Sequence, residues 1–148
     1  MSTVQTHAHS ERPEQVPNVA TDAIVVRPKP ENESLHDILL ITRLRDPFVG
    51  CLAFPGGFVD YNEDPMVGCL RELDEECGIK GKSAKLVTVA GNPKRDPRKH
   101  IISIVYQIEM EDPTQEAKAG DDAASAQWYD LKEVWATRDM AFDHKDIL

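Results

Sequence analysis

The sequence predicts an α/β domain of stacked layers around a mixed β-sheet. Three observations favour this class. Short apolar segments rich in β-branched residues, which are typical of strands, dominate the chain. One segment with helical periodicity and clear start and stop signals interrupts them near the middle, and more helical pattern follows only towards the end. This order of elements indicates layers of helix and mixed sheet rather than a doubly wound parallel sheet.

The first half of the chain contains three strand patterns. Residues 19–27 are apolar and β-branched and end at a polar turn, residues 28–33. Residues 38–42 form a continuous apolar run bounded by charged residues, which predicts a buried strand. Residues 51–54 are a short apolar piece that stops at residues 55–57, Pro-Gly-Gly, which we interpret as a strong break.

The central helix is the best-marked element. Pro65 suits a first helical turn, and either Glu63 or Asp64 can cap it. Gly78 is a C-terminal stop signal. Apolar residues recur between these signals at helical spacing and predict one buried stripe. The stripe consists of Met66, Leu70, Leu73 and Cys77.

The second half returns to strands and ends in helical pattern. The strand patterns are residues 86–90, 100–109 and 125–129. Residues 93–99 form a basic loop and residues 111–122 a long acidic one. Residues 131–135 begin a helix, and residues 143–146 begin a last one.

Length and charge limit the classes of function. The chain has 148 residues, the size of one domain with a real core. Its formal net charge of -9 argues against a large nucleic-acid interface. A small anionic ligand is compatible with this charge, because a basic cluster or a bound cation can reverse the local field. No apolar run approaches the roughly 20 residues that a membrane-spanning helix needs, so we expect no membrane partner.

Residues 1–17 are expected to form a disordered tail ahead of a domain at residues 18–148. The tail has no apolar core of a signal peptide, and His7 and His9 are weak metal candidates within it. An odd set of three cysteines without CxxC spacing argues against a disulfide framework or structural zinc. The cysteines are Cys51, Cys69 and Cys77. We therefore expect a reducing, cytoplasmic location.

Three carboxylates mark the polar side of the central helix. Glu72, Glu75 and Glu76 stand at i, i+3 and i+4 and share one face, roughly 130° from the apolar stripe at about 100° per residue. A solvated acidic face is the alternative interpretation. However, solvated helices usually interleave lysines at i+4, and this face has none. Hard divalent cations such as magnesium bind oxygen ligands of this kind.

The loop ahead of the helix adds to this cluster. Gly56 and Gly57 allow the backbone to approach a ligand closely. Glu63, at the turn into the helix, can point to the same cleft. Arg71 is a fixed cation beside Glu72 and can pair with a carboxylate and orient it.

These residues resemble the Nudix family. Residues 57–79 match the family's signature at every defined position. The matching positions are Gly57, Glu63, Arg71-Glu72-Leu73, Glu75-Glu76 and Gly78-Ile79. The resemblance implies an α/β/α sandwich with a central catalytic helix, and hydrolysis of a pyrophosphate bridge by water.

The resemblance also implies roles for these residues. The implied Mg²⁺ ligands, with Mn²⁺ as a substitute, are Glu72, Glu75, Glu76 and the Gly57 carbonyl. Glu63 would support the metal site, and Arg71 would orient the glutamates. The general base stays open between Glu76, Glu75 or Glu63 and a loop carboxylate, Asp121 or Asp122.

Features outside the signature resemble the ADP-ribose pyrophosphatase branch. They are the motif Arg95-Asp96-Pro97-Arg98 ahead of residues 101–106, residues 39–43 leading to 54–60, residues 120–123 leading to Trp128, and residues 141–144. The branch implies hydrolysis of ADP-ribose to AMP and ribose 5-phosphate, and a homodimer. The implied substrate contacts are Arg43, Arg95, Arg98 and Phe58. Asp96-Pro97 has a plainer interpretation as a turn former.

Two rival functions share this sequence pattern. A nucleoside triphosphate pyrophosphohydrolase would use the same signature and metal. A non-catalytic Nudix-fold ligand sensor would usually lack signature glutamates or carry a DNA-binding domain, whereas this chain keeps every signature residue and leaves little room for a second domain. Removal of an RNA cap is disfavoured by the net charge and by the lack of an aromatic-rich basic strip.

Overall fold

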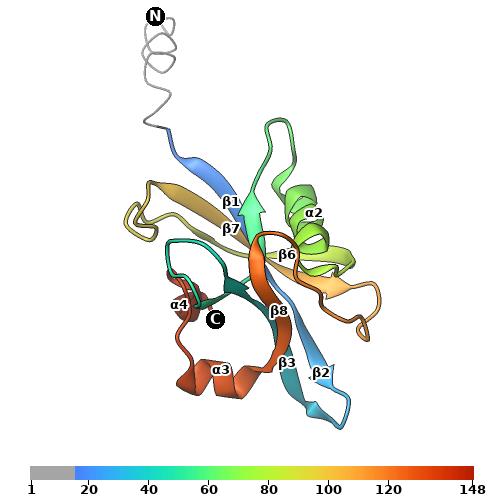
Figure 1. The fold of residues 1–148 in the computed structure, drawn as a ribbon. Helices are drawn as coiled ribbons and strands as arrows, with labels where there is room; N and C mark the ends of the chain where they lie inside the picture. Colours follow the sequence, from blue (N-terminus) through green and yellow to red (C-terminus); the bar gives the residue numbers. More distant parts are fainter. Residues whose placement is uncertain (1–15) are drawn as a thin grey trace, which may run out of the picture.

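The computed structural model describes residues 16–148, which fold into two four-stranded sheets and three helices (Figure 1). The expected tail, with His7 and His9, lies almost entirely outside the described residues. Within residues 16–148, no helix combines the length and apolar character needed to cross a membrane.

The first sheet has the strand order β5-β1-β7-β6. β1 (Asn18–Ile24) runs parallel to β7 (Ile101–Met110). β5 (Gly56–Phe58) pairs antiparallel with β1, and β6 (Gly81–Ala90) pairs antiparallel with β7. The sheet is therefore mixed, as the sequence predicts.

The second sheet is antiparallel and is organised around β3 (Asn32–Arg43). β3 pairs with β2 (Val26–Lys29), β4 (Leu52–Ala53) and β8 (Ala123–Asp130). Figure 1 shows α2 on one side of the sheets and α3 and α4 on the other. The expected α/β/α layers are confirmed.

β3 separates two hydrophobic cores because successive side chains of a strand point to opposite faces. Leu39 and Ile41 face the larger core, beneath α2. Ile38 and Leu40 face the smaller core, which includes Val134 of α3. A strand buried on both faces reads as a continuous apolar run, and this explains the pattern at residues 38–42.

The central helix, α2 (Pro65–Cys77), begins and ends where the sequence predicts. The Asp64 carboxylate accepts a hydrogen bond from the N–H of Met66, and Gly78 closes the helix with a φ of 67°. The expected stripe is wrong at Met66, whose side chain is exposed. The buried line runs instead through Cys69, Leu73 and Cys77 at i+4 spacing, so the first turn projects beyond the core.

Strand ends differ from the sequence prediction where the hydrophobic pattern is weak. β3 begins at Asn32 and β6 at Gly81, earlier than the predicted starts at residues 38 and 86. The sequence does not reveal these first residues because they are largely exposed and carry no apolar pattern. The predicted break at residues 55–57 overlaps the strand β5. A side chain at Gly56 would place its Cβ 2.2 Å from the Thr21 carbonyl oxygen, so glycine permits this close pairing with β1.

The C-terminal helices close the smaller core. α3 (Leu131–Thr137) is capped by Asp130, whose carboxylate accepts from the N–H of Lys132. α4 (His144–Ile147) follows a short segment that is tied to β4 by a bridge between Leu52 and Met140. The expected helix starts at residues 131 and 143 are thus correct to within one residue.

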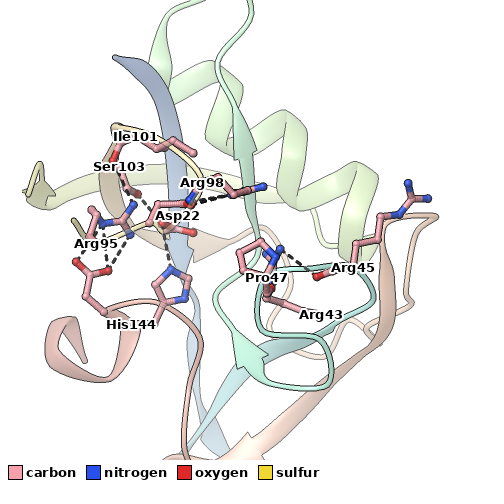
Figure 2. A network of polar contacts seen from close by, with 11 residues as sticks. Asp22, Arg43, Arg45, Pro47, Arg95, Arg98, Ile101, Ser103 and His144 are labelled. Carbon is pink, nitrogen blue, oxygen red and sulfur yellow. Dashed lines mark hydrogen bonds and ion pairs between the residues drawn. The ribbon is translucent and has the colours of Figure 1, made fainter. Parts of the chain in front are cut away.

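A buried polar cluster joins α4 to β1 (Figure 2). Asp22, in the middle of β1, accepts a hydrogen bond from the Ser103 hydroxyl, and its carboxylate lies 3.5 Å from His144 Nε2. Burial acts to raise the pKa of Asp22, but His144, Ser103 and Arg95 outweigh it and lower this pKa below its usual value. Ionised Asp22 therefore stabilises the fold.

We expect Asp22→Asn to lower the free energy of unfolding by about 2 kcal/mol at pH 7, because a charged acceptor of two donors is lost. Since the folded-state pKa is depressed, the contribution is present above the unfolded value of 3.8 and is lost as the pH falls through the folded pKa. Urea unfolding at pH 7 and at about pH 3 tests this. The difference in the free energy of unfolding between Asp22→Asn and wild type should be smaller at the lower pH. Asp139→Asn, at an exposed position, should have the same free energy of unfolding as wild type at both pH values.

Candidate active site

A cavity of about 710 Å³ opens beside the second half of α2. Its walls come from α2, β5, the end of β3 and four loops that are distant in sequence. The lining residues are Ile41, Arg43, Leu44, Arg45, Asp46, Gly56, Gly57, Phe58, Asp60, Glu72, Glu75, Glu76, Arg98, Asp121 and Asp122. We call the α2 side, with Glu72, Glu75 and Glu76, the acidic wall. The basic wall is the side with Arg43 at the end of β3 and Arg45 and Arg98 from loops.

Arg71 organises the carboxylates at the acidic wall. Its Nε donates to Glu63 Oε2 at 2.7 Å, and its Nη2 donates to Glu63 Oε1 at 3.0 Å. Its Nη1 donates to Glu72 at 2.9 Å and to Glu75 at 3.0 Å, and Asp60 lies 3.5 Å from Nη2. One planar cation thus holds four carboxylates in place, as a guanidinium fork allows.

Both carboxylate oxygens of Glu63 accept hydrogen bonds within this arrangement. The fork of Arg71 and the backbone N–H of Asp60 hydrogen-bond its carboxylate and lower the pKa of Glu63 to about 2. Glu63 is not among the residues that line the cavity. The structure therefore places it behind the acidic wall, and its predicted role in supporting the metal site stays a prediction.

Gly57 makes room for Glu72. A Cβ at Gly57 would lie 2.4 Å from the carboxyl carbon of Glu72. The absence of a side chain therefore lets the helix carboxylate rest directly on the β5 backbone. Burial raises the pKa of Glu72, although Arg71 acts in the opposite direction.

Glu76 is the most buried carboxylate of the cavity, with 8% of its surface exposed. The N–H of Gly56 donates to its Oε2 at 3.3 Å. Burial raises the pKa of Glu76 to about 7, and the nearby charges of Glu72, Asp122 and Asp22 add to the effect. An excess of negative charge is therefore concentrated at this end of the cavity.

The donor set fits a hard divalent cation. Glu72 lies against the Gly57 backbone and Glu76 against that of Gly56, so both offer carboxylate oxygens here, and the local surplus of negative charge favours a cation. Within residues 16–148, however, no three His, Cys, Asp or Glu side chains converge into a ready cation cage. Arg71 draws Glu72 and Glu75 towards itself instead. The ligand assignment thus stays a prediction.

The acidic loop, residues 111–122, is fastened to the end of α2. The N–H groups of Lys118 and Gly120 donate to the carbonyls of Cys77 and Glu76 at 2.8 and 2.7 Å. A Cβ at Gly120 would lie 2.4 Å from the Glu75 carbonyl oxygen, so glycine permits this contact. The loop thereby caps free helix carbonyls and brings Asp121 and Asp122 to the cavity.

The basic wall faces these carboxylates. Arg43, at the end of β3, donates from Nε to the Pro47 carbonyl at 2.6 Å (Figure 2). Arg98 makes a bidentate pair with Asp96, with Nη2 2.7 Å from Oδ2. Asp96 is 4% exposed and also accepts from the N–H of Arg98, so it combines the expected turn with the orientation of Arg98.

Arg95, which the sequence predicts as a substrate contact, does not line the main cavity. Its side chain is 5% exposed and makes a bidentate ion pair with Asp143. It lines a smaller cavity of about 90 Å³ with Asp22 and His144 rather than the main one, and the two cavities share Gly57, Phe58 and Arg98. Arg43, Arg98 and Phe58 do line the main cavity.

Several lining residues are absent from the sequence prediction. Arg45 and Asp46 stand in the loop after β3, and Arg45 lies 3.9 Å from Asp122 across the opening. Asp60 occupies a variable position of the signature. The charged loop beside Arg43 was a usable signal for Arg45, but which loop residues face the cleft depends on tertiary structure.

Comparison with known proteins decides the family. A NUDIX domain model matches residues 16–148. The chain belongs to the Nudix family. This Nudix protein is 42% identical over 132 residues to the ADP-ribose pyrophosphatase of Methanocaldococcus jannaschii, covering 89% of this chain and 71% of that protein. The expected Nudix pyrophosphohydrolase, similar to the ADP-ribose pyrophosphatase branch, is confirmed.

Relatives of another kind match as well. The chain is 35% identical over 115 residues to the ADPR responsive transcriptional repressor NtrR of Acinetobacter baylyi, over 75% of this chain and 44% of that protein. The NUDIX domain of Shewanella oneidensis NrtR, solved in complex with ADP ribose, has a TM-score of 0.81 at 23% identity and covers 97% and 92% of the two chains. This last likeness concerns the fold. Nudix hydrolases generally use divalent metal ions.

Proposed function

We propose that this Nudix protein hydrolyses the pyrophosphate bond of ADP-ribose in a Mg²⁺-dependent reaction that yields AMP and ribose 5-phosphate. The observation that carries the proposal is that one cavity has both an acidic wall and a basic wall. A diphosphate needs both, because arginines bind its oxygens and carboxylates hold the cations that offset its charge. The identity to an ADP-ribose pyrophosphatase supports this substrate class.

The roles follow from position. Arg43 and Arg98 bind the diphosphate from the basic wall, and Glu72, Glu75 and Glu76 with the Gly57 carbonyl hold the cation. A bound Mg²⁺ supplies charge neutralisation and a water of lowered pKa. Water adds to one phosphorus while the bridging P–O bond breaks. Glu76 accepts the water proton, because it is the buried carboxylate of the cavity, whereas the side chain of Asp122 is 81% exposed.

A substrate panel tests the proposal. The purified protein is mixed with Mg²⁺ and, separately, ADP-ribose, dATP and 8-oxo-dGTP, and the products are separated by chromatography. We expect ADP-ribose to be consumed fastest, with AMP and ribose 5-phosphate as products, and excess EDTA to abolish the reaction. Mn²⁺ should restore it. Faster turnover of a triphosphate would favour the housecleaning alternative and overturn the proposal.

The repressor relatives make ligand sensing the second candidate. A sensor would bind ADP-ribose without consuming it in Mg²⁺, so binding without product would favour this function. The retained signature glutamates support catalysis instead.

We also propose a cytoplasmic homodimer without nucleic-acid or membrane partners. Light scattering of the purified protein tests the dimer.

A further inference from the structure

The ring of Phe142 is shared by three arginines. The guanidinium carbon of Arg43 lies 4.9 Å from the ring centroid, that of Arg98 5.8 Å and that of Arg95 5.9 Å. Phe48 packs edge-on against the same ring at 5.0 Å. Cations at such distances over an aromatic ring are attracted by its quadrupole. Phe142 is therefore the common contact of residues from the end of β3, the loop after it and the loop ahead of β7.

Two of these arginines carry positive charge into the main cavity. Arg43 and Arg98 line it, and they repel one another: burial and the charge of Arg98 lower the pKa of Arg43. The polar contacts described for Arg43 are backbone carbonyls, those of Pro47 and Arg45, which orient its guanidinium without neutralising it. The ring of Phe142 does the same. Because Asp96 offsets the charge of Arg98, the two arginines keep one of their two positive charges available to an anion.

The segment around Phe142 is firmly held. The N–H of Ala141 donates to the Leu52 carbonyl at 2.8 Å. The N–H of Phe54 donates to His144 Nδ1 at 3.1 Å, and the two rings stack at 4.6 Å. Asp143 pairs with Arg95 at 2.8 Å. Phe142 itself has a φ of 53°, an unusual conformation that its neighbours on both sides fix.

We propose that Phe142 is a positioning residue whose ring holds Arg43 and Arg98 towards the cavity as one anion-binding subsite for the diphosphate of the substrate. The identity of that substrate rests on the proposed function, but the subsite itself does not. Phe142 does not line the main cavity and is not one of the residues assigned to the cation. It should therefore affect substrate binding more than the chemical step.

The test compares three variants. Phe142→Leu removes the ring but keeps the same backbone strain, and Phe142→Tyr keeps the ring. Met140→Ala is the matched control, because Met140 belongs to the same segment and the smaller core but does not line the cavity. Binding of inorganic diphosphate is measured by calorimetry at low salt in excess EDTA, and kcat and KM for ADP-ribose are measured with Mg²⁺. Thermal unfolding reports the stability of each variant.

We expect Phe142→Leu to raise the dissociation constant for diphosphate, and KM for ADP-ribose, about tenfold, with kcat within about twofold. Phe142→Tyr and Met140→Ala should stay within about twofold of wild type. Unchanged diphosphate binding in Phe142→Leu would overturn the proposal, as would an equal loss in the tyrosine variant or no diphosphate binding by wild type. If diphosphate binding depends on Phe142 while ADP-ribose is not hydrolysed, the subsite stands and the proposed function fails.

Discussion

Glu76→Gln is expected to lower kcat for ADP-ribose by about 10³-fold, within the range that a general base contributes. Glutamine has the same shape and can still accept the hydrogen bond from the Gly56 N–H. It can neither take a proton from water nor offer a charged ligand to the cation. Steady-state assays with saturating Mg²⁺ measure the effect. Glu116→Gln, on the exposed part of the acidic loop, is the control and should keep wild-type activity.

The same variant should gain stability while it loses activity. In EDTA, the Glu76 carboxylate is destabilising when ionised, because its folded pKa of about 7 lies above the usual 4.5. The loss of folding stability caused by ionised Glu76 is complete above about pH 7, decreases as the pH falls, and vanishes below 4.5. Glu76→Gln should therefore be more stable than wild type by about 3 kcal/mol at pH 8 and equal to it near pH 4. Equal unfolding midpoints at both values would refute this explanation.

The sequence predicts the acidic wall because a single helix carries its three glutamates. The 3.6-residue period places Glu72, Glu75 and Glu76 on one face without any knowledge of the tertiary structure. Gly57 and Arg71 belong to the same signature, and both lie against Glu72 in the structure. The structure adds that Arg71 binds four carboxylates rather than one. Periodic patterns do not encode the reach of a long side chain.

The basic wall is less predictable because it is made by loops. Arg43 and Arg98 are 55 residues apart in the chain and come together only through the pairing of strands and the docked C-terminal segment. Arg95 and Arg98 belong to the same short motif, yet one pairs with Asp143 outside the main cavity and the other lines it. Sequence spacing in a loop does not fix side-chain direction. Asp22 carried a usable signal, since a carboxylate inside an apolar strand requires buried partners.

Arg71→Ala should lower kcat/KM for ADP-ribose by about 100-fold and raise the Mg²⁺ concentration needed for half-maximal rate. The loss removes the partner that Asp60, Glu63, Glu72 and Glu75 share, so these carboxylates repel one another and the acidic wall loses its shape. Titration of activity with Mg²⁺ measures both effects.

Two comparisons separate geometry from charge. Arg71→Lys keeps the positive charge but not the planar fork, so it should recover only part of the activity. Lys80→Ala removes an exposed pair with Asp74, on the same helix, and should leave the rate unchanged because exposed single pairs contribute little. If lysine at position 71 restored full activity, charge alone would suffice. A rate that falls in the order wild type, lysine, alanine would instead mean that the fork holds the carboxylates in the arrangement that receives the cation.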